Sequence, residues 1–359
     1  MRVTPPVRIT AATSTVADVF APAEYFAPTV YPYGALVSVA ADYKIYESLQ
    51  ANNFGNTPNV SPLWWRAVGH VETLYSAATS YALGATCSGA NGRVYESLVA
   101  GNLGNPLPVL PETTTTKWVD VGPTNKWAMF DLASNTQTVH HQLGVDGASM
   151  TVTFAPGERI NTLGLTGLVA NSVTVTATSV FGGGTVYGPK TIDLNRRVVN
   201  DGYEYAFYPF STWPATALFD LPAYSDIIVT VTLNSTSGNV KCGSCIVGTY
   251  MYLGAAQYGA ENDGMNFSTI TRDAYGNATL VPRRTLPRTN QTLSLPVHRV
   301  GQALAARTRL NAVPALWTGL DDAQSEYFEM LLILGVYKTF KIAAAGATMA
   351  TVSLELEEI

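Results

Sequence analysis

The sequence predicts a mainly β protein of several domains, and three observations point to it. Charged residues make up only 13% of the 359 residues, about half of the ~25% usual in globular domains. Thr, Ser, Asn, Gly and Tyr must therefore supply the polar surface, and they suit strands and turns better than helices. Several segments alternate apolar and polar residues, and two segments in the first third are copies of one another. This composition argues against α-rich enzymes and coiled coils.

The charge balance, the apolar pattern and the cysteines argue against further classes of protein. The 21 basic and 26 acidic residues leave a formal charge of −5, which gives no electrostatic attraction to nucleic acid or to an anionic membrane. No stretch of about 18 apolar residues occurs, so the sequence predicts no membrane span. Pro5 and Pro6 interrupt the N-terminal segment, so we expect no secretory signal. The three cysteines, Cys87, Cys242 and Cys245, indicate synthesis in a reducing compartment.

The first third of the chain contains a duplication. YESLQANNFGN at 46–56 matches YESLVAGNLGN at 95–105, and each copy closes on a Trp-x-x-Val-Gly sequence. A Tyr/Gly stretch precedes each copy, at 33–35 in the first and 81–85 in the second. Short strands, Gly/Asn turns and a few large aromatics in each copy predict two small β modules.

The two modules occupy 31–69 and 80–122, after an N-terminal arm at 1–30. A strand with Tyr, a loop rich in Gly, Asn and Pro, and a closing Trp resemble the small chitin-binding modules of carbohydrate-active enzymes. The pattern YESL…GN…P…W..VG is also similar to virion proteins of tailed bacteriophages. The resemblance implies carbohydrate-binding-like modules carried on a virion protein.

Residues 125–255 have the pattern of an antiparallel β-sandwich. The segments 149–154, 172–180 and 227–233 alternate apolar and polar residues, and Gly-rich turns separate the strands. The opening sequence WAMFD resembles that of a galactose-binding-like jelly roll, which implies a fold and no particular ligand.

Residues 256–359 predict an α+β domain. The segment 296–311 places Val297, Val300 and Leu304 at helical spacing behind a proline, which predicts one principal helix packed against a sheet. The segment 331–340 is a candidate buried strand, and 350–357 alternates as a strand with one buried face does.

The chain from Gly188 onward carries a second resemblance. The short sequences FDLP, KCG, QYGA and YKTF resemble an incompletely characterised family of phage tail or virion-associated proteins. The closing sequence TVSLEL is similar to the endings of tail-tube and distal-tail proteins. This resemblance implies assembly with other tail proteins and with copies of the chain itself.

Two groups of residues have spacings that metals or redox chemistry use. Cys242 and Cys245 form a CxxC pair, but too few other ligands accompany them for zinc, so we interpret them as cysteines on a buried strand. His140 and His141 lie in a polar stretch between predicted strands, and neighbours in a strand face opposite ways, so both cannot easily bind one ion. We expect a surface or loop role for them, with metal or substrate binding as the alternative.

Catalytic patterns are absent from the sequence. The carboxylates are scattered, and neither HExxH, GxSxG nor a Walker loop occurs. Glycoside hydrolysis would require two convergent carboxylates, and no recognisable hydrolase motif supplies them. We therefore expect no enzymatic activity and no cofactor, while a glycosidase with an unfamiliar site stays an alternative.

Aromatic residues of the modules are the candidates for stacking on sugar rings. They are Tyr43, Tyr46, Trp64, Trp65, Tyr95 and Trp118. The competing interpretation is that Tyr46, Trp65, Tyr95 and Trp118 form the module cores, because so small a domain needs large side chains inside. Trp64 has Lys117 as its counterpart in the second copy, which makes it the better candidate for a ligand or partner contact.

Taken together, these features predict a structural component of a bacteriophage tail tip or baseplate. We expect it to assemble in the host cytoplasm as a symmetric oligomer and to reside in the virion. Its partners would be other phage tail proteins and copies of itself, with a host-surface glycan as a further candidate. The alternative is a non-viral carbohydrate-binding protein or the targeting module of a polysaccharide-active enzyme, in which two tethered modules amplify weak binding.

Overall fold

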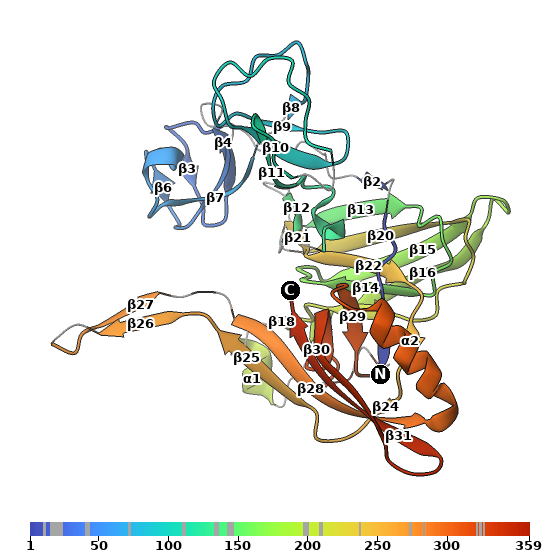
Figure 1. Cartoon of the computed structure of the whole chain (residues 1–359). Coiled ribbons are helices and arrows are strands. Elements are labelled where there is room, and N and C mark those ends of the chain that lie inside the picture. The colour runs from blue at the N-terminus through green and yellow to red at the C-terminus, as the bar shows by residue number, and fades with distance from the viewer. Residues whose placement is uncertain are drawn as a thin grey trace. The chain divides into compact units, whose positions relative to one another are not determined.

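The computed structural model confirms a mainly β protein (Figure 1). It divides into two compact units: a first unit of Met1–Thr15 and Met129–Ile359, and a second unit of Val16–Ala128. The structure describes the chain apart from residues 10–11, 15–23, 40–43, 71–72, 110–112, 133–135, 142–146, 197–200, 208–210, 237, 273–274, 282, 284, 321, 323–324 and 326.

The largest sheet of the first unit has eight antiparallel strands from both ends of the sequence. In order they are β23 (Met251–Tyr252), β1 (Arg2–Thr4), β29 (Ala315–Thr318), β30 (Leu332–Ala344), β31 (Met349–Glu358), β28 (Thr285–Pro296) and β24 (Ala255–Ala256), with β25 (Glu261–Asn266) also paired to β28. In β31 the side chains of Val352, Leu354 and Leu356 are buried, which confirms the alternation expected for this strand.

One helix packs against this sheet. The short η3 (Val297–Arg299) leads into α2 (Val300–Arg309), which is the principal helix expected from the sequence. Ala303 and Ala306 on its inner face and Leu310 just after its end join the same buried cluster as Val3 and Trp317 of the sheet. The small alanine side chains allow the helix to approach the sheet closely, and the cluster forms the core of this half of the unit.

The N-terminal residues belong to this core, although the sequence suggests an arm at 1–30. β1 lies between β23 and β29, and Val3 is completely buried. The Arg2 guanidinium lies over the rings of Phe219 and Tyr250, at 4.6 and 4.4 Å from their centroids. A strand of three residues followed by two prolines is too short to show a period, so the sequence pattern could not reveal it.

Two further sheets of the first unit carry the sandwich-like part. A five-stranded antiparallel sheet has the order β16 (Thr185–Asp193), β15 (Ser172–Ser179), β20 (Ile227–Ser235), β13 (Ala148–Phe154) and β2 (Ala12–Ser14). A three-stranded sheet has the order β19 (Thr216–Leu218), β14 (Thr162–Thr166) and β22 (Ser244–Gly248). The alternating segments predicted as strands are β13, β15 and β20.

The three-stranded sheet joins the sandwich-like part to the C-terminal sheet. On one face Ala217 and Ile246 cluster with Leu316 of β29, and a Cβ on Gly164 would collide with the Leu316 side chain. On its other face Leu163 is buried as well. The three-stranded sheet is therefore covered on both sides. The boundary that the sequence suggests between 125–255 and 256–359 falls inside a single compact unit.

The remaining elements of the first unit are short. They are β12 (Thr138–His141) with β21 (Asn239–Cys242), β17 (Asn195–Arg196) with β18 (Ser211–Thr212), β26 (Thr269–Arg272) with β27 (Ala278–Val281), α1 (Gly202–Phe207), and η2 (Ala128–Phe130), which begins at the last residue of the second unit.

The second unit contains both duplicated modules. The first module has β3 (Val30–Tyr31) paired with β6 (Asn53–Phe54), η1 (Pro58–Val60), and a sheet of β4 (Leu36–Val39), β5 (Lys44–Ser48) and β7 (Trp65–His70). The second has the sheet β11 (Trp118–Pro123), β10 (Arg93–Ser97), β9 (Thr86–Ser88) and β8 (Thr73–Leu74). Each module has too few residues for a layered core, so its aromatics must supply one.

Candidate functional site

The second module is built around three aromatic rings. Tyr75 and Tyr81 stack with ring centroids 6.0 Å apart, and both meet Trp118 at a steep angle, at 5.9 and 5.1 Å. The Trp118 indole Nε1 donates to the Asn105 carbonyl at 3.0 Å. Burial and the neighbouring phenol of Tyr81 raise the pKa of Tyr75. The indole thus fills the centre of the module while its polar edge is satisfied by a loop carbonyl.

The first module repeats this arrangement. Tyr25 and Tyr31 stack at 5.6 Å, and both meet Trp65 at a steep angle, at 5.9 and 5.2 Å. The Trp65 indole Nε1 donates to the Asn56 carbonyl at 2.8 Å. The duplication read from the sequence is therefore a duplication of one aromatic core.

A hydrogen-bond network is duplicated with the rings. In the second module Asn102 Nδ2 donates to Ser97 Oγ at 2.9 Å and to the Lys117 carbonyl at 3.1 Å, and Asn105 Nδ2 donates to Asn102 Oδ1 at 2.7 Å. The first module has the same bonds among Ser48, Asn53, Asn56 and Trp64, at 2.9 to 3.2 Å. The asparagines of the repeated sequence hold each Gly/Asn loop against its closing strand.

Four of the candidate sugar-stacking residues lie inside these cores. Trp118 is completely buried, Trp65 and Tyr95 are 2% and 1% exposed, and Tyr46 is 7% exposed. A ring needs a face open to solvent to stack on a sugar, so this burial supports the interpretation of the four as core residues. Tyr43 lies outside the described residues.

Sequence reasoning missed part of the aromatic core. Tyr25 and Tyr75 precede the predicted module boundaries at 31 and 80, and Tyr31, rather than Tyr33, is the counterpart of Tyr81. The signal was available, because Tyr25 and Tyr31 have the same spacing as Tyr75 and Tyr81. Aligning the copies over their tyrosines as well as over YESL would have found it.

The surface of the first module is where a ligand could make contact. Trp64 is partly buried against the module core. Val30 and Phe54 are opposite one another on β3 and β6, so their side chains share a face, and both are more than half exposed. Tyr33 is also exposed, at 71%. This aromatic exposure distinguishes the first module from the second.

The equivalent positions of the second module are aliphatic or charged. Leu103 corresponds to Phe54, Leu83 to Tyr33, and Lys117 to Trp64. Leu83 and Leu103 are exposed, so both modules present apolar side chains at these places. Only the first presents aromatic rings there, which makes it the better candidate for stacking on a planar or ring-shaped ligand.

The surroundings of the CxxC pair, Cys242 and Cys245, indicate a structural role. Cys242 ends β21 and Cys245 lies in β22, and both are buried free thiols. Burial raises the pKa of Cys242 to about 12 and raises that of Cys245 as well. A thiol that stays protonated at neutral pH is a poor nucleophile and a poor metal ligand, which supports the interpretation of buried-strand cysteines.

The two adjacent histidines belong to strand β12, whereas the sequence suggested a place between strands. Within the described parts of the chain, no group of three or more His, Cys, Asp and Glu side chains is positioned to hold a metal ion. Among the same residues, no helix has the length and apolar character that a membrane crossing requires.

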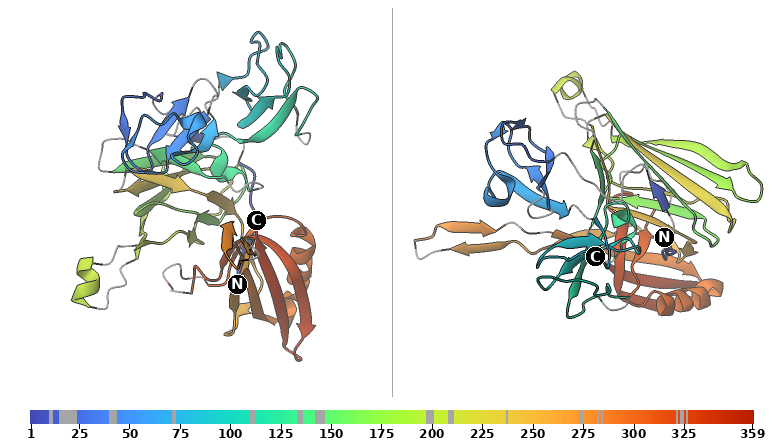
Figure 2. Two further views of the ribbon diagram at one scale, coloured as in Figure 1. Left: turned by 90° about the vertical axis from the view of Figure 1, so that its left-hand side faces the viewer. Right: turned by 90° about the horizontal axis from the view of Figure 1, so that it is seen from above.

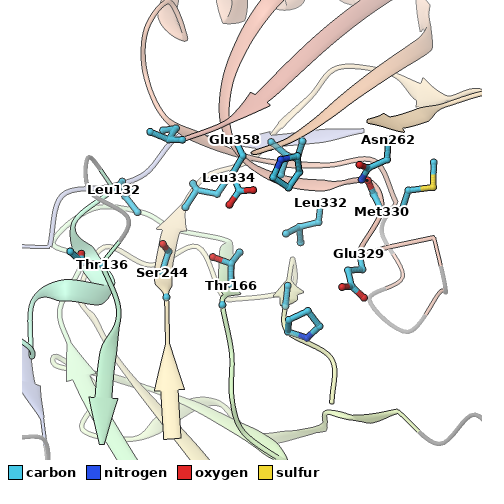
Figure 3. Close-up of a pocket in the computed structure, with 17 residues that line it drawn as sticks. Leu132, Thr136, Thr166, Ser244, Asn262, Glu329, Met330, Leu332, Leu334 and Glu358 are labelled. Atoms are coloured by element: carbon cyan, nitrogen blue, oxygen red, sulfur yellow. The ribbon is translucent and has the colours of Figure 1, made fainter. Parts of the chain in front are cut away.

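A cavity of about 500 Å³ lies in the first unit (Figure 3). It lies between strands of the C-terminal sheet and the ends of β14 and β22, and its lining includes Leu132, Leu332 and Leu334. Glu329 and Glu358 also line it, and no lysine or arginine is among its described lining residues. The cavity therefore combines an apolar wall with two carboxylates.

No protein-family model matches the sequence, and no curated protein matches it.

Proposed function

We propose that the chain is a structural component of a bacteriophage tail, at the tip or baseplate, which assembles as a symmetric oligomer. Its duplicated modules are presented for contact with the host surface or for docking another virion protein. The tandem duplication carries this proposal, because two small units with the same aromatic core and the same loop network accompany one large β body. The resemblance of the repeated sequence to virion proteins supplies the setting.

The surface of the first unit supports an assembly role. Large apolar side chains are exposed at several places on it, among them Phe181 at a hairpin turn, Tyr258, and Ile270 and Leu280 on the β26–β27 ribbon. Interface cores are depleted in charge and rich in aromatics, and only 13% of this chain is charged. Such side chains are stabilised when another subunit covers them.

Two measurements test the proposal. Sedimentation velocity and negative-stain microscopy of the purified chain should give one defined ring or trimer, and antibody labelling of phage particles should mark the tail end. A chain that stays monomeric at high concentration and binds no tail protein would contradict the proposal.

A second function is favoured by the exposed rings of the first module, namely carbohydrate binding by a non-viral protein or an enzyme's targeting module. Tyr33 and Phe54 are exposed aromatics on a module that resembles sugar-binding ones. A glycan array with the variants Tyr33→Ala, Phe54→Ala and Trp64→Ala tests it, with Leu83→Ala and Leu103→Ala as matched controls in the second module. Binding that survives all three aromatic substitutions would exclude aromatic stacking.

A further inference from the structure

The β26–β27 ribbon is the least covered regular element of the first unit. Figure 1 and the right-hand view of Figure 2 show it continuing away from β25 and β28. All four residues of β26 are exposed, and Ile270 and Leu280 expose 62% and 66% of their surface. A two-stranded ribbon alone is marginally stable in water, so a covering partner would stabilise this one.

The ribbon has one apolar and one largely polar face. Ile270 is opposite Leu280 and Arg272 is opposite Ala278, so these four side chains share a face. Thr269 and Thr271 of β26 and Val281 of β27 lie on the other face. A face with Ile, Leu and Ala beside an arginine fits an apolar surface that also carries carboxylates.

The ribbon segment is also basic, in contrast to the rest of the chain. Residues 267–284 contain three arginines and one aspartate, a formal charge of +2, which leaves −7 for the remainder of a chain whose total is −5. Two ribbons facing each other would place like charges together, which disfavours a ribbon-to-ribbon contact. The same charges favour an acidic surface on another copy.

The cavity of the first unit has the complementary character. Leu132, Leu332 and Leu334 provide apolar lining, and the carboxylates of Glu329 and Glu358 are its ionisable side chains (Figure 3). Arg196 reaches Glu329 only at 3.9 Å on an exposed surface, a pair that contributes little. The volume of about 500 Å³ is sufficient to receive side chains from a projecting ribbon.

From this complementarity we infer that the β26–β27 ribbon of one copy docks, through Ile270, Leu280 and Arg272, on the acidic apolar cavity of the next copy. The contact joins two different surfaces, so it is heterologous and propagates from copy to copy until a ring closes. The inference rests on the proposed function, which supplies the oligomer. It adds which two surfaces form the contact between copies.

Complementation between two variants tests the inference. The ribbon variant Ile270→Ser/Leu280→Ser keeps an intact cavity, and the cavity variant Glu329→Lys/Glu358→Lys keeps an intact ribbon. Each alone should associate at least tenfold more weakly than the unmodified chain in sedimentation velocity. Mixed in equal amounts, they should form a 1:1 dimer and nothing larger, because one ribbon and one cavity remain functional.

The controls separate this inference from the proposed function. Thr269→Ala/Thr271→Ala changes the opposite face of the ribbon and should assemble like the unmodified chain, and circular dichroism checks that every variant folds. If the ribbon variant assembles normally, or the mixture forms no dimer, the inferred interface is wrong while an oligomeric tail protein remains. If the unmodified chain stays monomeric, both the oligomer and this interface are overturned.

Discussion

Asn102 holds the loop of the second module to its closing strand. It is 1% exposed, and its amide group bonds the buried Ser97 hydroxyl, the Lys117 carbonyl just before the closing strand, and the Asn105 amide. Removal of the Asn102 amide would break all three bonds, one of them fully buried. The same position in the first module is Asn53, so each module depends on one asparagine in the same way.

We predict that Asn102→Ala lowers the free energy of unfolding of the second module by about 1–3 kcal/mol. Hydrogen exchange resolved by peptide should localise the loss to residues 73–123 and leave the first unit unchanged. The adjacent variant Leu103→Ala is the control, since that side chain is exposed. An equal loss in both variants would show that the loop is sensitive to any change.

Asp220 is the residue that makes part of the stability pH-dependent. It accepts hydrogen bonds from Lys190 Nζ at 2.7 Å and from the Tyr187 hydroxyl at 2.8 Å. Burial acts to raise the pKa of Asp220, but the hydrogen bonds from Lys190 and Tyr187 outweigh it, so its pKa lies below the ordinary 3.8. A lowered pKa stabilises the fold above pH 3.8, and this contribution is lost as the pH falls through the folded-state value.

We therefore predict that Asp220→Asn is less stable than the unmodified chain at pH 6 and that the difference shrinks below pH 3.8. Because both charged partners are partly exposed, the effect at pH 6 should stay below about 1 kcal/mol. Thermal melting from pH 6 to pH 2.5 measures it. A difference that is constant over this range would mean that the carboxylate charge is not what stabilises the contact.

Among the elements, β1 shows how a short segment can complete a large sheet. It pairs with β23 on one side and β29 on the other, and Val3 lies in the same buried cluster as α2.

We predict that Val3→Ala lowers the free energy of unfolding of the first unit by about 2 kcal/mol. Chemical denaturation measures this, with the exposed Arg8→Ala as the control that should leave the midpoint unchanged.

The elements that the sequence predicted are those whose environment is regular. The helix was expected from the spacing of Val297, Val300 and Leu304, but Val297 and Leu304 are exposed, and the buried residues of α2 are Ala303 and Ala306. β31 alternates because only one of its faces is buried. β14 gives no such pattern, since Thr162 through Leu165 are all buried between two layers. Its burial depends on Leu316, more than 150 positions away in the sequence, and no local pattern encodes such a contact.

The sequence predicted part of the candidate site. Trp65 and Trp118 stand out because the copies align around them, and their alternative interpretation as core residues follows from the small size of the modules. Tyr25 lies before the YESL alignment and was missed, although its spacing from Tyr31 repeats that of Tyr75 from Tyr81. The cavity could not be predicted, because its lining joins residues from distant strands.

At the scale of the whole molecule, the chain leaves the first unit and later returns to it. Met1–Thr15 and Met129–Ile359 form one compact unit, while Val16–Ala128 forms the other. The two modules have their own aromatic cores and their own hydrogen bonds. The second unit is thus an insertion near the N-terminus of a β body, and insertions of this kind are tolerated where few contacts cross the boundary.

This organisation predicts that residues 16–128 can be replaced by a flexible Gly/Ser linker of about 10 residues without unfolding the first unit. The shortened chain should keep a cooperative thermal transition and the burial of Cys242 and Cys245, which can be followed as resistance of the thiols to alkylation at pH 8. It should also keep self-association, because the ribbon and cavity lie in the first unit.

As a comparison, deletion of residues 1–15 instead should unfold that unit, since β1 and β2 are then lost. If removal of 16–128 exposes the thiols, the modules are part of the folding unit and the insertion view is wrong. If the thiols stay buried but association is lost, the modules themselves hold the oligomer together.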